Sequence, residues 1–255
     1  IDLSVGSVQA VAGIVAVAVL NSFSSVSVAL AATLFAGACI GLINGLLITR
    51  AQINSLIATL GMMAILRGGA MVSTQAVSIQ GAVDSFIEIG TGHLGPLPVP
   101  VLIAFLLLVL FFYVLHYTTF GRYVYAVGGN PQAARLSGLP VDRIRIAVFV
   151  VAGLLAALSA FILASRLNSG QPNAGLGFEL QVIAAVILGG ISLTGGVGTL
   201  AGALIGILIL TVLSNGLVLL NVSSFYHDIV RGIVIILAVY LDTRRKQSLV
   251  RRMLS

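Results

Sequence analysis

Residues 26–49 read VSVALAATLFAGACIGLINGLLIT and contain no charged side chain. The hydrocarbon core of a bilayer is about 30 Å thick, and an α-helix needs about 20 apolar residues to cross it. This stretch therefore predicts a membrane-spanning helix. The whole chain of 255 residues is 59% hydrophobic and 8% charged, whereas soluble domains carry roughly 25% charged residues. Such a composition excludes a chain that is surrounded mainly by water.

Apolar segments of similar length repeat from one end of the chain to the other, and no long linker interrupts them. We expect about eight spans in a single transmembrane domain that covers residues 1–255. The fold class is then that of an all-α polytopic membrane protein. The expected spans are 3–20, 26–49, 53–74, 98–117, 146–166, 179–194, 197–220 and 226–241.

Basic side chains gather in the 118–145 segment and in the C-terminal tail, which predicts that both are cytoplasmic. The 75–97 segment has two acidic residues and no Lys or Arg, and the 167–178 segment has no charge, so we expect both outside. The net charge of +6 thus reflects membrane orientation, and we expect no nucleic-acid partner. The basic residues in question are Arg122, Arg135, Arg143, Arg145, Arg244, Arg245, Lys246, Arg251 and Arg252.

Glycines recur at four-residue spacing in two of the expected helices. One set is Gly37, Gly41 and Gly45, and the other is Gly202 and Gly206. Small residues let helix backbones approach closely in lipid. Packing inside the subunit is the favoured interpretation for both sets, ahead of a dimer face.

Three short marks occur twice in the same order, which predicts an internal repeat. The marks are an acidic residue before Leu, the triplet Asn-Gly-Leu, and Arg-Gly. They fall in segments one, two and three and again in segments six, seven and eight. The offset of five spans is odd, so the halves 2–74 and 179–241 must cross in opposite directions, as in inverted-repeat transporters. The marks are Asp2-Leu3 and Glu179-Leu180, Asn44-Gly45-Leu46 and Asn215-Gly216-Leu217, and Arg67-Gly68 and Arg231-Gly232.

Polar residues within the spans or at their mouths are candidates for a transport route, because ionisable groups in a membrane usually face a cavity or a partner. Arg67 has no partner nearby in the sequence, and Asp2 or Glu179 from another helix is expected to neutralise it. A buried ion pair that joins helices explains these charges at least as well as contact with a substrate does. The full set of pathway candidates is Asp2, Ser4, Asn54, Arg67, Gln171, Asn173 and Glu179.

Catalytic and metal-binding patterns are absent from the sequence. A phosphate-cradling P-loop needs a lysine, and the single lysine, Lys246, lies in the tail. We therefore expect no enzyme activity of its own, no cofactor and no metal.

The 118–145 segment is the longest expected cytoplasmic connection, and it predicts a short helix. Asn130 suits the N-cap position, Pro131 the first helical position, and Gly138 the stop after the last turn. We expect a helix of about two turns that docks on a partner. Gly128, Gly129, Asn130, Arg135 and Gly138 are its predicted coupling residues.

Several motifs together resemble the ribose-type permeases of bacterial ABC importers, in the branched-chain amino acid/ribose permease superfamily. They are IDLSVGS at 1–7, FGR at 120–122, GGN at 128–130, SG at 137–138, SGQP at 169–172, GFEL at 177–180 and LGG at 188–190. The resemblance covers essentially the whole chain. It implies a multi-pass protein of the bacterial inner membrane.

The same resemblance implies a homodimer or heterodimer of permeases, a cytoplasmic ATPase docked on the 128–140 loop, and a periplasmic sugar-binding protein. The family's first helices precede the stretch that Ile1 matches, so further spans are expected upstream. A monosaccharide such as ribose or a similar pentose or hexose is the expected cargo. Autoinducer-2 and nucleosides remain alternatives, as do an ion-coupled secondary transporter and a membrane scaffold that transports nothing.

Overall fold

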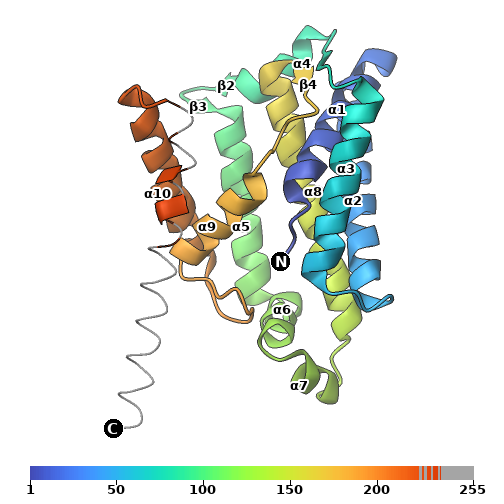
Figure 1. The fold of residues 1–255 in the computed structure, drawn as a ribbon, viewed down its shortest axis with the longest axis vertical. Coiled ribbons are helices and arrows are strands. Elements are labelled where there is room, and N and C mark those ends of the chain that lie inside the picture. The colour runs from blue at the N-terminus through green and yellow to red at the C-terminus, as the bar shows by residue number, and fades with distance from the viewer. Residues whose placement is uncertain (224–225, 227–228, 231, 235, 237–255) are drawn as a thin grey trace. The chain divides into compact units, whose positions relative to one another are not determined.

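Six helices in the described part of the chain are long and apolar enough to cross a membrane. The computed structural model describes residues 1–223, 226, 229–230, 232–234 and 236. The six helices are α1 (Val5–Phe23), α2 (Val26–Thr49), α3 (Ser55–Thr74), α5 (Val99–Tyr117), α8 (Val141–Leu167) and α10 (Leu200–Leu219). Figure 1 shows them as the long ribbons of the molecule. They confirm six of the expected spans and the all-α fold class.

The sixth expected span, 179–194, is wrong as a full crossing. Its residues form α9 (Phe178–Leu188), a helix of 11 residues, which is about 16 Å long at 1.5 Å per residue. The run of glycines that follows ends the helix, because Gly190 and Gly195 have positive φ angles of 76° and 94°. The last expected span, 226–241, lies largely outside the described residues.

The chain divides into two compact units. The first comprises Ile1–Val124 and Gln132–Glu179, and the second comprises Tyr125–Pro131 together with Leu180–Ser255. The first unit holds α1, α2, α3, α5 and α8. The second holds the end of α6 (Thr119–Gly129), most of α9, and α10.

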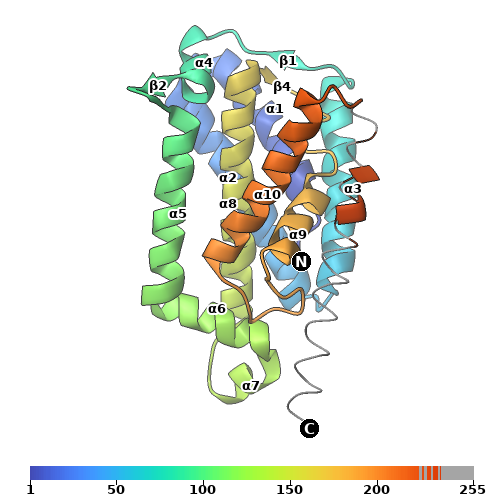
Figure 2. The ribbon, with the colours of Figure 1, turned by 90° about the vertical axis from the view of Figure 1, so that its left-hand side faces the viewer.

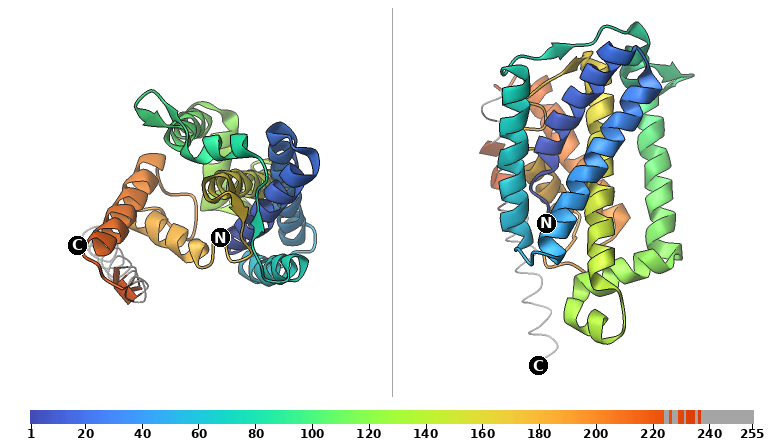
Figure 3. Two further views of the ribbon diagram at one scale, coloured as in Figure 1. Left: turned by 90° about the horizontal axis from the view of Figure 1, so that it is seen from above. Right: turned by 90° about the vertical axis from the view of Figure 1, so that its right-hand side faces the viewer.

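Close helix packing in the first unit follows the predicted glycine spacing. A methyl group at Gly37 would overlap Gly153 and Ala157 of α8, and one at Gly41 would overlap Phe149. The helices α2 and α8 therefore pack backbone to backbone over much of their length (Figure 3, right). In the second unit Gly202 faces Gly189, and Gly206 faces Ala185. Both glycine sets thus pack inside the subunit, as predicted.

The connections at one end of the first unit are structured. The strands β1 (Ile79–Gln80) and β4 (Ser169–Gly170) pair antiparallel, while β2 (His93–Leu94) pairs with β3 (Leu97–Pro98). The short helix α4 (Asp84–Thr91) packs on the end of α8, where Phe86 and Phe161 meet edge to face at 5.2 Å between ring centroids. The two segments expected outside, 75–97 and 167–178, are thereby joined at one end (Figure 2).

The 118–145 segment is more helical than predicted. α6 (Thr119–Gly129) precedes α7 (Pro131–Leu136), and only α7 was expected. The positive φ of 81° at Gly138 confirms that residue as the stop after α7. Gly128 and Gly129, two of the predicted coupling residues, are the last two residues of α6. Sequence patterns concealed α6 because its aromatic and glycine residues are weak helix formers.

Candidate functional site

An irregular stretch, residues 171–177, leads from β4 into α9 and has no regular helix or strand. Gly175 and Gly177 adopt positive φ angles of 66° and 72°, a conformation that costs side-chain-bearing residues about 1–2 kcal/mol. Irregular backbone at membrane depth is tolerated where it is buried in protein or lines a cavity. This stretch is therefore a candidate for part of a transport route.

Arg67 holds the irregular stretch from the interior of α3. Its Nη1 donates to the carbonyl oxygens of Pro172 at 2.7 Å and Ala174 at 2.8 Å. Those carbonyls have no helical partners, and an unsatisfied polar group is costly in a membrane. The arginine thus supplies from its side chain the hydrogen bonds that the broken backbone lacks.

The start of α1 is a second polar centre in the same unit. The Asp2 carboxylate accepts hydrogen bonds from the Ser4 backbone N–H at 2.8 Å and from its hydroxyl at 2.6 Å. Asn44 of α2 donates its Nδ2 to the Ser4 Oγ at 2.9 Å, and both residues are fully buried. The backbone N–H of Leu3 donates to Thr59 Oγ1 of α3. Ser4 and the Leu3 backbone therefore anchor the start of α1 to α2 and α3, and Asp2 holds the Ser4 hydroxyl.

Gly6 brings this start of α1 against the irregular stretch. A methyl group at Gly6 would overlap the Gly175 carbonyl and the Glu179 carboxylate. A methyl group at Gly175 would in turn lie 2.5 Å from the Gly6 carbonyl oxygen and 2.6 Å from Oε1 of Gln9. The acidic residue at the start of α9 thus lies beside α1, and the contact depends on two glycines.

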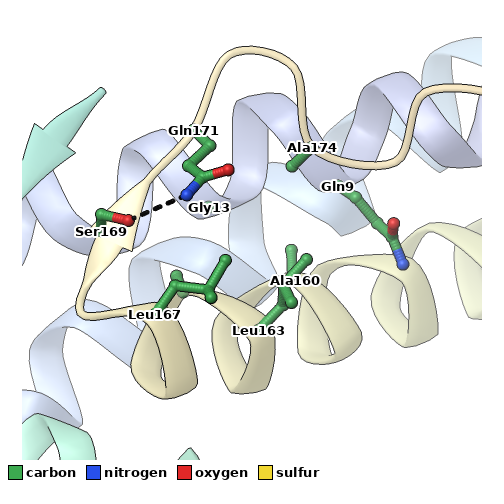
Figure 4. Close-up of a pocket in the computed structure, with 9 residues that line it drawn as sticks. Gln9, Gly13, Ala160, Leu163, Leu167, Ser169, Gln171 and Ala174 are labelled. Atoms are coloured by element: carbon green, nitrogen blue, oxygen red, sulfur yellow. Dashed lines mark hydrogen bonds between the residues drawn. The ribbon is translucent and has the colours of Figure 1, made fainter. Parts of the chain in front are cut away.

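A small pocket opens between α1, α8 and the irregular stretch (Figure 4). It has room for about one water molecule, which is too little for a monosaccharide in this conformation. Gln171 Nε2 donates to Ser169 Oγ at 3.3 Å on one side, and Gln9 Nε2 donates to Ser159 Oγ at 3.0 Å nearby. Its lining residues are Gln9, Gly13, Ala160, Leu163, Ala164, Leu167, Ser169, Gln171 and Ala174.

Five of the seven predicted pathway residues lie in this region. Asp2 and Ser4 precede α1, Arg67 lies in α3, Gln171 lies in the irregular stretch, and Glu179 lies at the start of α9. The other two differ. Asn54 is exposed and caps the start of α3, where its Oδ1 accepts from the Leu56 N–H at 2.9 Å. Asn173 is also exposed.

Three polar residues of the site escaped the sequence-based prediction. Gln9 and Thr59 lie within apolar helices, and Asn44 was noted only as a mark of the repeat. The signal was available in each case, because a polar side chain in an apolar helix needs a partner. Asn44 also keeps a buried Oδ1 for which the described residues supply no hydrogen-bond donor.

Arg67 makes no ion pair with Asp2 or Glu179 among the described residues and bonds to the two carbonyls instead, although Glu179 lies close enough to interact with its charge. Within the described residues the single ion pair joins Arg135 and Asp142 at 2.7 Å, and both side chains are largely exposed. This pair ties α7 to the start of α8. No group of three or more acidic, His or Cys side chains gathers as a metal site in the part of the chain that the structure describes.

The short helix α7 has one apolar side chain that is almost fully exposed and another that is buried. Leu136 is 91% exposed, while Ala134 is buried. The N–H groups of Gly138 and Leu139 donate to the carbonyls of Arg135 and Ala134 and close the helix end. α7 is therefore a braced helix with an apolar residue left uncovered.

The comparisons with known proteins agree with this architecture. The model of the family described as branched-chain amino acid transport system, permease component, matches residues 1–239. The ribose import permease protein of Escherichia coli K12 is 46% identical over 250 residues, which cover 96% of this chain and 78% of that protein. The corresponding Bacillus subtilis protein is 45% identical, over 96% of this chain and 77% of its own length.

An L-arabinose ABC transporter permease protein of Azospirillum brasilense is 42% identical, over 97% of this chain and 73% of its own. No solved structure gives a significant match. The predicted family resemblance is therefore confirmed. With its apolar helices and its match over nearly the whole length, the chain belongs to the permease components of the branched-chain amino acid transport system family, which are multi-pass membrane subunits of ABC importers.

Proposed function

We propose that this chain is the membrane-spanning subunit of an ATP-driven importer for a monosaccharide, with a pentose such as ribose or arabinose as the first choice. It acts by alternating access and hydrolyses no ATP itself. Its partners in this proposal are a second permease, identical or related, a cytoplasmic ATPase and an external sugar-binding protein. The relatives include permeases named for ribose and for L-arabinose, which supports the choice of cargo.

The chemistry of the region around the irregular stretch supports a neutral polyol. Gln9, Gln171 and Ser159 offer amides and hydroxyls, which donate and accept hydrogen bonds. The positive charge of Arg67 is already directed at backbone carbonyls. A charged cargo would need an opposite charge free to pair with it, whereas a sugar needs only neutral hydrogen-bonding groups.

The observation that carries the coupling part of the proposal is α7. A six-residue helix with a capped end, an ion pair to the next helix and a nearly fully exposed leucine stands directly before the long helix α8. An exposed apolar side chain on a braced helix is suited to fill a pocket on a partner. We assign that partner as the ATPase, and the predicted coupling residues Asn130, Arg135 and Gly138 as the frame of the contact.

Reconstitution into proteoliposomes with the ATPase and the binding protein tests the transport activity. We expect uptake of labelled ribose or arabinose that requires ATP and the binding protein and that persists when ionophores collapse ion gradients. Uptake that follows an ion gradient without ATP would establish a secondary transporter instead. Competition by nucleosides or autoinducer-2, but not by pentoses, would reassign the cargo.

A charge placed on α7 tests the docking contact. Leu136→Asp should abolish copurification with the ATPase, because an unpaired charge would be buried in the contact. Leu94→Asp is the matched control, since Leu94 is also exposed, at 72%, but lies on β2 at the end expected outside. Copurification of both variants with the ATPase at the parental level would refute the assignment of α7.

A further inference from the structure

The turn between α9 and α10, residues 189–199, has an ordered backbone of its own. The Ser192 N–H donates to the Val197 carbonyl at 2.9 Å, and the Gly195 N–H donates to the Ser192 carbonyl at 3.1 Å. Thr199 then caps α10 by accepting from the Gly202 N–H at 3.0 Å. The segment, called the elbow below, is thus a defined connector between two helices.

The elbow lies directly against the last turns of α6, and all of these residues belong to the second unit. A methyl group at Gly128 would lie 2.6 Å from the Gly196 backbone nitrogen, and one at Gly195 would lie 2.7 Å from the Gly128 carbonyl oxygen. The Tyr125 hydroxyl donates to the Gly198 carbonyl at 3.1 Å. We call this contact of Tyr125 and Gly128 with Gly195, Gly196 and Gly198 the α6 clasp.

We propose that the α6 clasp transmits the movement of the coupling helix to α9 and α10. α6 ends at Gly129, and α7 begins at Pro131, so the single residue Asn130 separates the helix that carries the clasp from the helix that we assign to the ATPase contact. The inference rests on that proposed function. Tyr125, Gly128 and Gly196 are then positioning residues of the transport cycle, which touch neither sugar nor nucleotide.

The clasp suits transmission because backbone meets backbone. Flexible side chains absorb small movements by changing rotamer, whereas two directly packed backbones cannot. The glycine at position 128 is needed for closeness and not for an unusual conformation, since it belongs to a helix and is not among the residues with positive φ. An alanine there would force the elbow away without straining the local backbone.

Neighbouring glycines provide the test and its control. A methyl group at Gly129 would meet no atom within 4 Å, so Gly128→Ala and Gly129→Ala differ only in overlap with the elbow. Both variants are assembled with the ATPase and the binding protein, and association, ATP hydrolysis and uptake are measured. We expect Gly128→Ala to keep its ATPase association but lose about tenfold in uptake per ATP hydrolysed, because overpacking displaces the elbow. Gly129→Ala should keep the parental ratio.

The ratio of uptake to hydrolysis separates transmission from simple stability, because misfolding lowers both together. If Gly128→Ala fails to accumulate in the membrane, Tyr125→Phe decides, since it removes only the hydroxyl bond to Gly198. It should lower the ratio by about twofold to fivefold. If both Gly128→Ala and Tyr125→Phe keep the parental ratio of uptake to ATP hydrolysis, the clasp does not transmit the movement. If the glycine variant does not accumulate, a parental ratio for Tyr125→Phe alone leads to the same conclusion. An ATPase that still binds the Leu136→Asp variant would instead overturn the assignment of α7 as the coupling helix in the proposed function.

Discussion

The chain interrupts its helices in two regions that solve the same physical problem differently. The irregular stretch 171–177 has its carbonyls satisfied by a charged side chain, Arg67, from another helix. The elbow 189–199 satisfies much of its backbone internally and adds one tyrosine hydroxyl. The irregular stretch belongs to the segment 167–178 that is expected outside, yet its donor comes from the interior of the expected span α3, where no water is available to bond the backbone. The elbow has no need of such a donor, because its own N–H and carbonyl groups bond to one another.

Removal of the Arg67 side chain should have the largest effect on the difference between the two regions. Arg67→Leu leaves two carbonyls without their partner and should lower the free energy of unfolding by about 3 kcal/mol or more. Transport should be lost. Arg166→Leu is the control, because Arg166 is exposed at the end of α8, and it should stay within about 0.5 kcal/mol. Denaturant unfolding in detergent gives both values, and equal stabilities would remove the special role of Arg67.

Paired glycine variants in the irregular stretch give the next largest effect. Gly175→Ala combines a positive φ with overlap on Gly6 and Gln9 and should cost about 2–3 kcal/mol. Gly177→Ala also has a positive φ, but a methyl group there meets nothing within 4 Å, so its cost should be about 1 kcal/mol. The same unfolding titration measures the difference. A Gly177→Ala variant as unstable as Gly175→Ala would show that the positive φ alone, without steric overlap, determines the loss of stability.

The equivalent pair in the elbow should differ by less. Gly196→Ala overlaps Gly129, whereas Gly190→Ala, with a similar φ of 76°, meets open space. We expect the two to differ by about 1 kcal/mol in unfolding, because the internally bonded elbow can shift and keep its own hydrogen bonds. A gap as large as that between Gly175→Ala and Gly177→Ala would mean that the two breaks are equally constrained.

The smallest expected effect is at the hydrogen bond beside the irregular stretch. Ser159→Ala removes the acceptor of Gln9 Nε2 and should lower stability by about 0.6 kcal/mol, the average for interhelical hydrogen bonds in membrane proteins. Thr33→Ala serves as the comparison, since the Thr33 hydroxyl bonds within its own helix to Ala29. Thermal unfolding in detergent resolves the two. A loss several times larger for Ser159→Ala would place Gln9 among the main supports of the stretch.

The candidate site was partly predictable from the sequence. Arg67 and Glu179 stood out because charges are rare in apolar helices. Their roles were not predictable, since an arginine bonds equally well to a carboxylate, a carbonyl or a sugar. Asn54 stood out for the same polarity and proved to be a helix cap. Gln9 was overlooked although it lies in an equally apolar run.

Hydropathy and charge bias by themselves determined the all-α membrane fold and the long spans, the capping residues determined the short helix α7, and the short motifs indicated the family by resemblance. These properties depend on local composition, because lipid forces each apolar segment to satisfy its own backbone in a helix. Tertiary structure alone decided that 119–129 is helical and which glycines touch. Those outcomes depend on partners distant in the sequence, such as Gly196 for Gly128 and the carbonyl of Pro172 for Arg67. Such pairings are set by packing, which no local pattern encodes.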